Sequence, residues 1–359
     1  MSRQVGFGFI GAGEIAMATA AAVQASEYAE LVRVVDARAD LAQDLAATYG
    51  GRPAATVEEL LADPTVEAVY IAVPHYLHKP LAVQSAAAGK HVLIEKPMGV
   101  SPDDAQAIVD VCRQHGVACG VPFVARYAPA YRQARQLVQH GAIGRVTGFR
   151  IVYRADKPLS YWSGGYSGRA TSDWRQNWAT AGGGVLIMNV IHDLDSVLWI
   201  TGVEVAQVEG VIANIGSPGE VEDVALAILH GAGGALGTIE ALAAVPGGQG
   251  PTRAWANRIY GSTGQIVLPA PWANDPLALF TRETGQWQTI EGATGTDARR
   301  MAVDDFAAAV RAGVSAPIPG EAGLYVSRIL HAIYAAARHG GRIAVTDSTA
   351  TAGRPSSRP

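Results

Sequence analysis

The sequence has few cysteines, no cluster of basic residues and no long apolar run. Its formal net charge is -4 and its pI is about 6.1, and no basic stripe stands out, so we expect no nucleic-acid partner. No apolar run reaches the roughly 18 residues of a membrane span. The first residues lead directly into a strand-like segment, which leaves no room for a signal peptide. We therefore expect a cytoplasmic protein with no membrane partner.

The thiol content consists of Cys112 and Cys119. These residues are too far apart for a CxxC pair, and the pattern places one on a helix and the other on the next strand. The alternatives are a redox pair or metal site, or two small buried hydrophobic side chains, and we favour the second. His75 and His78 also raise a metal question, but no acid with ligand spacing accompanies them. We expect no metal.

The 359 residues are enough for two domains, and the hydrophobic fraction of 49% provides a sizeable core. In the first third of the chain, short apolar segments alternate with helix-like ones. The expected strands are residues 5–10, 31–35, 68–73 and 91–94, with helices between them. This alternation is typical of βαβ units and a parallel, doubly wound sheet in an α/β fold.

The pattern changes after about residue 145. Longer strands are expected at 146–154, 205–215, 221–229 and 235–242, and the glycines of 231–234 predict a hairpin turn. Helices are expected at 184–200, 297–312 and 322–337. Many strands with few helices between them indicate an α+β domain with a large, mostly antiparallel open sheet. We expect residues 347–359 to form a disordered tail.

A glycine-rich turn directly follows the first predicted strand. Gly11 and Gly13 belong to a GxGxxA motif that opens a helix through Glu14 and Ile15. The first glycine permits a tight turn, and the second allows the backbone to approach a pyrophosphate at the positive end of the helix. The motif predicts a dinucleotide site, to which we assign these four residues.

The cofactor choice depends on Asp36 and Arg38. Asp36 ends the second strand, where an acid accepts hydrogen bonds from the adenosine ribose and repels a 2′-phosphate. Its alternative role is that of a strand-end or capping residue. Arg38 is either a solvated arginine or a ligand of a 2′-phosphate. We favour NAD, with NADP as the alternative.

Three ordered motifs resemble those of the Gfo/Idh/MocA family, which includes glucose–fructose oxidoreductase and inositol 2-dehydrogenase. Residues 72–78 are similar to its TPNxxH loop. Residues 89–97 end in its Glu-Lys-Pro signature, here Glu95-Lys96-Pro97. Residues 182–195 resemble its GGGxLxDxxxHxxD helix. The resemblance covers about residues 4 to 345.

This resemblance implies a Rossmann domain, residues 1–122, and an α/β substrate-binding and oligomerisation domain, residues 123–346. It also implies an NAD(P)-dependent oxidoreductase that transfers a hydride to or from a hydroxyl or carbonyl carbon of a sugar or polyol. The sheet of the second domain would form a homodimer or homotetramer. The further cofactor-binding residues that we assign are Pro74, His75, His78, Glu95 and Lys96.

The resemblance assigns catalysis to Lys96 and His192. An ammonium at the end of a parallel strand can stabilise a developing alkoxide. A histidine has a suitable pKa to take the hydroxyl proton. Asp195 shares a helix face with His192, so it either orients the imidazole or packs the helix.

The sequence departs from the family pattern at one position. Met188 stands where family members carry an aspartate or asparagine four residues before the histidine, and a thioether cannot shuttle a proton. Asn189 lies near the same helix face and could bind substrate. Either His192 works with Lys96 alone, or another group helps, or the substrate is unusual.

The substrate pocket is expected to involve the loop 160–175, which is rich in Tyr, Trp, Gly and Arg. Aromatic and guanidinium groups suit a polyhydroxylated ring or an acidic group; the alternative is a packed surface loop. The full set of expected substrate-binding residues is Lys96, Arg126, Tyr161, Trp174, Arg175, Asn189 and His192. Two other functions remain open: an NADP-dependent keto-sugar reductase that uses Arg38, and a non-catalytic dinucleotide sensor, which Met188 favours.

Overall fold

The computed structural model describes residues 3–247, 256–271, 275–291 and 297–346. It divides into two compact units of interleaved segments. The first unit comprises Met1–Val124, Leu159–Gly182 and Asp297–Leu324, and the second comprises the remainder. The sequence-based division at 122/123 cuts the chain once, whereas each unit here contains three segments. The expected disordered tail, 347–359, lies outside the described residues.

The first unit is built on a six-stranded parallel sheet with the strand order β3-β2-β1-β4-β5-β6. The expected doubly wound sheet is therefore confirmed. The strands are β1 (Val5–Ile10), β2 (Ala29–Val35), β3 (Arg52–Pro53), β4 (Ala68–Ile71), β5 (His91–Ile94) and β6 (Cys119–Gly120). The helices of eight or more residues are α1 (Glu14–Gln24), α2 (Ala39–Tyr49), α4 (His78–Ala87), α5 (Pro102–Gln114) and α10 (Ala298–Ala312); the shorter ones are α3 (Val57–Ala62), α7 (Tyr161–Gly164), α8 (Trp178–Ala181) and the single turns η1 (His75–Leu77) and η3 (Trp174–Gln176).

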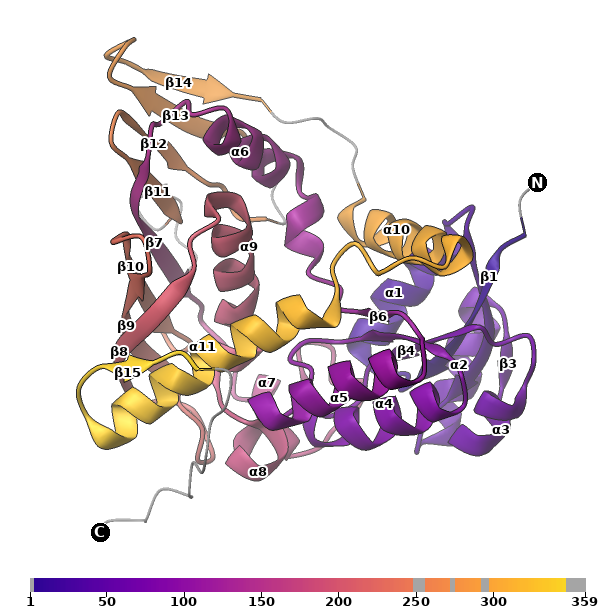
Figure 1. Cartoon of the computed structure of the whole chain (residues 1–359). Helices are drawn as coiled ribbons and strands as arrows, with labels where there is room; N and C mark the ends of the chain where they lie inside the picture. The colour runs from indigo at the N-terminus through magenta and orange to yellow at the C-terminus, as the bar shows by residue number, and fades with distance from the viewer. Residues whose placement is uncertain (1–2, 248–255, 272–274, 292–296, 347–359) are drawn as a thin grey trace. The chain divides into compact units, whose positions relative to one another are not determined.

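Successive residues of β1 point to opposite faces of this sheet, and their side chains determine how helices pack on each face. Phe7 and Phe9 join a buried core with residues of α1, α2 and α10, including Phe306. On the other side, a side chain at Gly8 would lie 2.6 Å from Leu60 of α3. Figure 1 shows α4 and α5 lying side by side. The N-cap expected for α5 is present, because the Ser101 hydroxyl accepts a hydrogen bond from the Asp104 amide at 3.1 Å.

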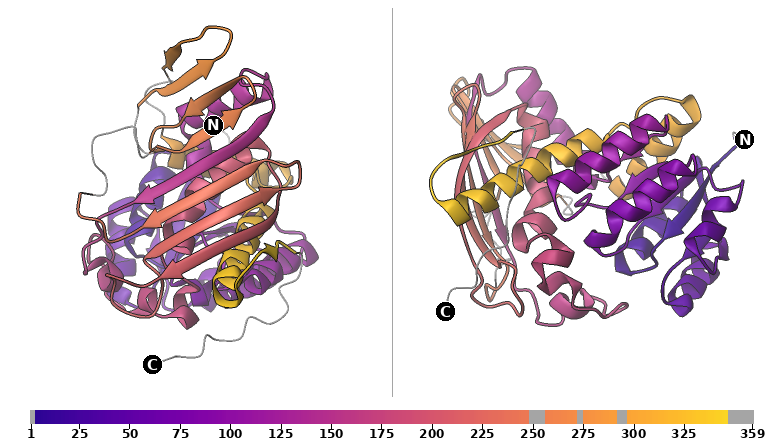
Figure 2. Two further views of the ribbon diagram at one scale, coloured as in Figure 1. Left: turned by 90° about the vertical axis from the view of Figure 1, so that its left-hand side faces the viewer. Right: turned by 60° about the horizontal axis from the view of Figure 1, so that its bottom comes forward.

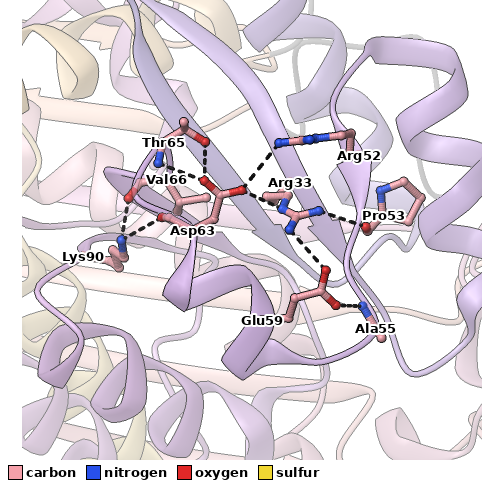
Figure 3. A network of polar contacts seen from close by, with 9 residues as sticks. All are labelled: Arg33, Arg52, Pro53, Ala55, Glu59, Asp63, Thr65, Val66 and Lys90. Carbon is pink, nitrogen blue, oxygen red and sulfur yellow. Dashed lines mark hydrogen bonds and ion pairs between the residues drawn. The ribbon is translucent and has the colours of Figure 1, made fainter.

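A polar network fixes α3 to the sheet (Figure 3). Arg33 of β2 donates to the carboxylates of Asp63 and Glu59 at 2.8 and 3.1 Å. The ammonium of Lys90 donates to the carbonyl oxygens of Asp63 and Val66 at 3.1 and 2.7 Å. Together these contacts connect β2, α3, the loop after α3 and the residue before β5. We therefore assign the network a role in folding.

The second unit contains a nine-stranded sheet with the order β14-β13-β12-β11-β7-β10-β9-β8-β15. Among the described strands of this sheet only β7 and β10 pair in parallel, so the expected mostly antiparallel sheet is confirmed. The strands are β7 (Val146–Arg154), β8 (Val205–Ala213), β9 (Val224–Gly231), β10 (Leu236–Leu242), β11 (Arg258–Gly261), β12 (Gly264–Val267), β13 (Leu277–Thr281), β14 (Trp287–Ile290) and β15 (Ile343–Ala344).

Helices cover one face of this sheet. They are α6 (Pro129–Gln139), α9 (Ile191–Thr201) and α11 (Gly320–His339), of which the last begins in the first unit. The opposite face carries no helix among the described residues of the unit (Figure 2, left). One face of the sheet is thus covered and the other is open.

Strand β9 and the helix that carries His192 differ from their expected form. Strand β9 begins at Val224 rather than 221, because the Asp223 carboxylate instead accepts the amide hydrogens of the preceding loop, including that of Gly216 at 2.6 Å. The helix expected at 184–200 opens with a π-helical turn, η4 (Leu186–Val190), before α9. The segment Trp178–Thr201 is apolar and long enough for a membrane span, but 78% of its most apolar window is buried, as in the core helix of a soluble protein.

Candidate active site

The glycine turn between β1 and α1 has the geometry of a pyrophosphate site. Gly11 has φ +99°, and a side chain there would lie 2.4 Å from the carbonyl oxygen of Ala72. Nothing lies within 4 Å of a side chain built at Gly13, and no side chain caps α1 there. The start of α1 therefore has open space beside Gly13 and no capping side chain, which suits an anion at the helix N-terminus. Ile15 is 37% exposed beside this turn.

Asp36 lies at the carboxyl end of β2 and faces the same turn. One carboxylate oxygen accepts the amide hydrogen of Ala12 at 2.7 Å, and the other accepts that of Arg38 at 2.9 Å. These bonds orient the carboxylate, whose remaining lone pairs suit ribose hydroxyls. The guanidinium of Arg38 is bound by Asp40 at 2.6 Å, so it is already paired with a carboxylate.

The loop 160–175, which is rich in aromatic residues, belongs to the first unit, where it contacts the glycine turn. The guanidinium of Arg169 donates to the Ala12 carbonyl oxygen at 2.8 Å and pairs with Asp44 at 2.7 Å. The Glu14 carboxylate accepts the amide hydrogen of Tyr166 at 3.1 Å. The sequence placed this loop in the second domain and gave Arg169 no role of its own. These contacts join residues more than 100 positions apart, which local patterns do not reveal.

The two histidines after β4 and Pro74 bind backbone groups. Nδ1 of His75 donates to the carbonyl oxygen of Ala181 at 2.7 Å, and its ring meets the edge of Trp174 with centroids 4.4 Å apart. Both ring nitrogens of His78 lie within hydrogen-bond distance of carbonyl oxygens, 2.7 Å for Nδ1 and 2.9 Å for Nε2. Burial lowers the pKa of both imidazoles. Within the described residues, no three His, Cys, Asp or Glu side chains form a possible metal site.

Lys96 follows β5 and lies in an electrostatically unusual place. The buried Glu95 carboxylate accepts the Tyr70 hydroxyl at 2.7 Å and the Lys96 amide hydrogen at 3.2 Å. Burial lowers the pKa of the Lys96 ammonium to about 8; the Arg299 and Arg175 cations add to this lowering and Glu95 opposes it. Lys96 therefore remains mostly protonated at neutral pH, yet close to its titration point.

Arg175 brings two of the expected substrate-binding aromatic residues to this region. Its guanidinium lies 4.6 Å from the ring centroid of Trp174 and 5.4 Å from that of Tyr161. The first unit thus brings together Lys96, Glu95, His75, Trp174 and Arg175. Their assignment to cofactor or substrate stays a prediction.

In the second unit, a buried carboxylate determines the start of the histidine-bearing helix. Glu222 accepts the amide hydrogens of Gly184 and Leu186 at 2.6 and 2.9 Å and the Tyr334 hydroxyl at 2.9 Å. Side chains at Gly183 and Gly184 would lie 2.1 Å from the Tyr334 hydroxyl and 1.8 Å from the Glu222 carbonyl oxygen. The glycines are therefore required by close packing. Burial raises the pKa of Glu222 to about 7.

The helix residues around His192 are largely buried. Met188 is 5% exposed, so the residue in place of the family's acid is buried. The side-chain oxygen of Asn189 is buried and has no hydrogen-bond partner in the described structure, which suits a group that binds substrate. The next residue after His192, Asp193, accepts a hydrogen bond from Asn257 at 2.7 Å, and burial raises its pKa to about 6.

Asp195 is engaged by a cation of its own unit. Its two oxygens accept hydrogen bonds from Nε and Nη2 of Arg126 at 2.8 and 2.6 Å, and its side chain is fully buried. This bidentate pair favours the packing role of Asp195 over orientation of His192. The expected contact of Arg126 with substrate stays a prediction.

Together, the strand order of the parallel sheet, the glycine turn and the acid after β2 define a dinucleotide-binding oxidoreductase with a Rossmann unit. Two family models match the chain. Residues 5–123 match the oxidoreductase family with an NAD-binding Rossmann fold, and residues 131–267 match the GFO/IDH/MocA C-terminal domain. The chain belongs to the Gfo/Idh/MocA family of oxidoreductases.

Similar proteins act on sugars. The chain is 31% identical over 219 residues to 1,5-anhydro-D-fructose reductase of Ensifer adhaerens, which covers 60% of this chain and 63% of that protein. It is 27% identical over 259 residues to levoglucosan dehydrogenase of Pseudarthrobacter phenanthrenivorans, covering 66% of this chain and 64% of that protein. A solved structure of levoglucosan dehydrogenase with NADH and levoglucosan superposes with a TM-score of 0.83 at 25% identity, covering 96% and 100% of the two chains.

Proposed function

We propose that the protein transfers a hydride between NAD(H) and a hydroxyl or carbonyl carbon of a sugar, polyol or related compound. The observation that carries this proposal is the half-buried Lys96 at the carboxyl end of a Rossmann strand, bonded through its amide to Glu95. The relatives named for sugar reduction and oxidation support the substrate class. The open space at Gly13 and the oriented Asp36 carboxylate fit the pyrophosphate and ribose of the cofactor.

Lys96 and His192 are the proposed catalytic groups. In the oxidation direction, His192 takes the hydroxyl proton, and the Lys96 ammonium stabilises the developing alkoxide. The hydride leaves the same carbon, and NAD+ supplies its acceptor when bound. In the reverse direction, His192 returns the proton to the alkoxide.

Substitution of each group tests this chemistry. Lys96→Met and His192→Ala should each lower turnover by about a hundredfold or more while NADH binding, followed by fluorescence, stays near wild type. Lys79→Met is the matched control, because Lys79 pairs with Asp104 and is 47% exposed. Wild-type turnover in both Lys96→Met and His192→Ala, measured on the best substrate of a dye-linked sugar and polyol screen, would contradict the mechanism.

One observation favours a second function. The buried Met188 replaces the acid that the family pattern places before the histidine, as in a dinucleotide sensor without catalysis. Failure of every sugar and polyol to support turnover, together with tight NADH binding, would establish this alternative. Met188→Asp provides a further test, because a restored acid should raise activity on ordinary polyols only if the acid has been lost without replacement by Asn189.

We also propose that the open face of the nine-stranded sheet forms a homodimer or homotetramer contact. Four apolar side chains of β8, β9 and β10 are 43% to 62% exposed: Val211, Leu226, Ile228 and Leu236. Strand pairing places Val211 beside Leu226, so these exposed apolar side chains form a continuous patch. Exposure of such a patch to water is unfavourable. A monomer by light scattering at micromolar concentration would contradict the proposal, and Ile228→Glu should weaken the assembly.

The proposed location is the cytoplasm, with small molecules rather than nucleic acid or membrane as partners. The acidic charge balance of the sequence supports this proposal. Fractionation of cells that express the full chain tests it, and recovery in the membrane fraction would contradict it.

A further inference from the structure

A line of buried polar side chains leads from α10 to the strand that ends at Lys96. Arg299 of α10 donates to the hydroxyl of Thr19 at 3.0 Å, and Thr19 donates to the hydroxyl of Tyr70 at 2.9 Å. Tyr70 donates to Oε1 of Glu95 at 2.7 Å. Thr19, Tyr70 and Glu95 are at most 7% exposed, so each of these bonds lies largely out of water.

Arg299 also interacts with Glu95 directly. Its Nη1 lies 3.6 Å from Oε1 of the carboxylate, while Oε2 accepts the Lys96 amide hydrogen at 3.2 Å. The Glu95 side chain is 9% exposed and that of Arg299 is 22% exposed. One largely buried carboxylate is thus shared between a permanent cation and the residue that carries the titratable ammonium.

We propose that Arg299 is a positioning residue for the reaction: it shares the Glu95 carboxylate with Lys96 and so sets how readily the Lys96 ammonium releases its proton. The proposal rests on the proposed catalytic role of Lys96. A cation that occupies Glu95 reduces the negative charge that would otherwise stabilise the ammonium, and it also repels the ammonium directly. Both effects favour release of the proton.

Several other charged or titratable groups interact with Lys96, but Arg299 is the one that also pairs with Glu95. Arg175 of η3 is a second cation that disfavours the ammonium. His75 of η1 and His78 of α4 also interact with Lys96, and burial lowers the pKa of both imidazoles, which disfavours their charged forms. Glu95 is the carboxylate that favours the ammonium, and Arg299 is the cation paired with that carboxylate.

The predicted consequence is a change in the titration of Lys96. Without Arg299, the pKa of the ammonium should rise from about 8 by about half a unit or more, because a neighbouring cation is lost and Glu95 is no longer paired with it. The ammonium then persists to higher pH. If Lys96 must be protonated to stabilise the alkoxide, the alkaline limb of turnover moves upward by the same amount.

The composition of the chain allows this titration to be measured directly. The sequence contains four lysines, Lys79, Lys90, Lys96 and Lys157. Carbon-13 labelling at Cε gives four signals for a pH titration by NMR, and Lys96→Met assigns the relevant one. The titration needs no substrate and no turnover.

The variants are Arg299→Met, which removes the charge, and Arg299→Lys, which keeps it. Arg300→Met is the matched control, because Arg300 is the next residue of α10 but pairs with Asp304 at 2.8 Å. We expect an upward shift for Arg299→Met and titration near the wild-type value for the other two. If Arg299→Met does not fold, Arg299→Gln, which can still donate to Thr19, takes its place.

An unchanged Lys96 titration in a folded Arg299→Met or Arg299→Gln protein would overturn the proposal, as would an equal shift in Arg300→Met. These outcomes are separate from failure of the proposed function. Wild-type turnover in Lys96→Met would show that Lys96 has no catalytic role. That result would not affect the titration of Lys96 in Arg299→Met, which tests the effect of Arg299 alone. A shifted titration with a matching shift of the alkaline limb would support both the tuning by Arg299 and the catalytic role of Lys96.

Discussion

Replacement of Asp36 by serine should abolish the preference of the protein for NADH over NADPH. The wild-type protein should bind NADH at least about tenfold tighter than NADPH, a difference of about 1.4 kcal/mol. Both Asp36 oxygens accept backbone amide hydrogens, at 2.7 Å from Ala12 and 2.9 Å from Arg38. The carboxylate is thus held in place for a ribose diol and against a 2′-phosphate.

The magnitude follows from the bonds that the carboxylate offers. A hydrogen bond to a charged group contributes about 1.5 to 3 kcal/mol. Loss of one ribose bond in Asp36→Ser should therefore weaken NADH binding by about 10- to 150-fold. The gain for NADPH should be smaller, because Arg38 is bound by Asp40 at 2.6 Å and must leave that partner to reach a 2′-phosphate.

A double variant isolates this competition. Asp36→Ser with Asp40→Ala should bind NADPH tighter than Asp36→Ser alone, while Asp40→Ala by itself should leave NADH affinity near wild type. Fluorescence titration with both cofactors measures each dissociation constant, and circular dichroism checks the fold. Equal wild-type affinities, tighter wild-type binding of NADPH, or unchanged NADH affinity in folded Asp36→Ser would refute the reasoning.

Two further predictions concern the carboxylates of Asp193 and Asp195 in the second unit. Because burial raises the pKa of Asp193 from 3.8 to about 6, the folded protein holds this proton more tightly than the unfolded chain, and stability should fall as pH rises from about 4 through 6. Asp193→Asn keeps the bond to Asn257 and should remove up to about 3 kcal/mol of this dependence in urea unfolding; identical pH profiles would argue against it. Arg126→Met leaves Asp195 buried without its cation and should cost about 3 to 5 kcal/mol. Adding Asp195→Leu should recover most of the loss in thermal unfolding, and no recovery would count against the pair.

Much of the Rossmann unit could be predicted from local patterns. The apolar strand before Gly11 and the serine cap before Pro102 are determined by residues close in sequence, and the structure confirms the expected elements. The element boundaries of the second unit were harder to predict from the sequence. Strand β9 begins later than predicted, because the Asp223 carboxylate accepts hydrogen bonds from loop amides. The π-helical turn before His192 has no simple periodic signature in the sequence.

The candidate site shows the same division. The sequence identified Lys96 through a short motif, but not Arg299, which lies more than 200 residues away and belongs to no motif. It also assigned the loop with Arg169 to the second domain, whereas the structure bonds that side chain to Ala12. Pairings between distant segments depend on packing, so a pattern within one segment does not specify them.

By itself, the sequence determined the parallel-sheet unit, the glycine turn, the acid after the second strand and the lysine after the strand at 91–94. Each depends on the conformational preferences of neighbouring residues and on strand and helix periodicity. Only the tertiary structure decided the electrostatic setting of that lysine. Burial and the nearby cations Arg299 and Arg175 lower its pKa to about 8 against the opposing charge of Glu95. Interactions between charges depend on their separation in space and on exclusion of water, and not on their separation in sequence.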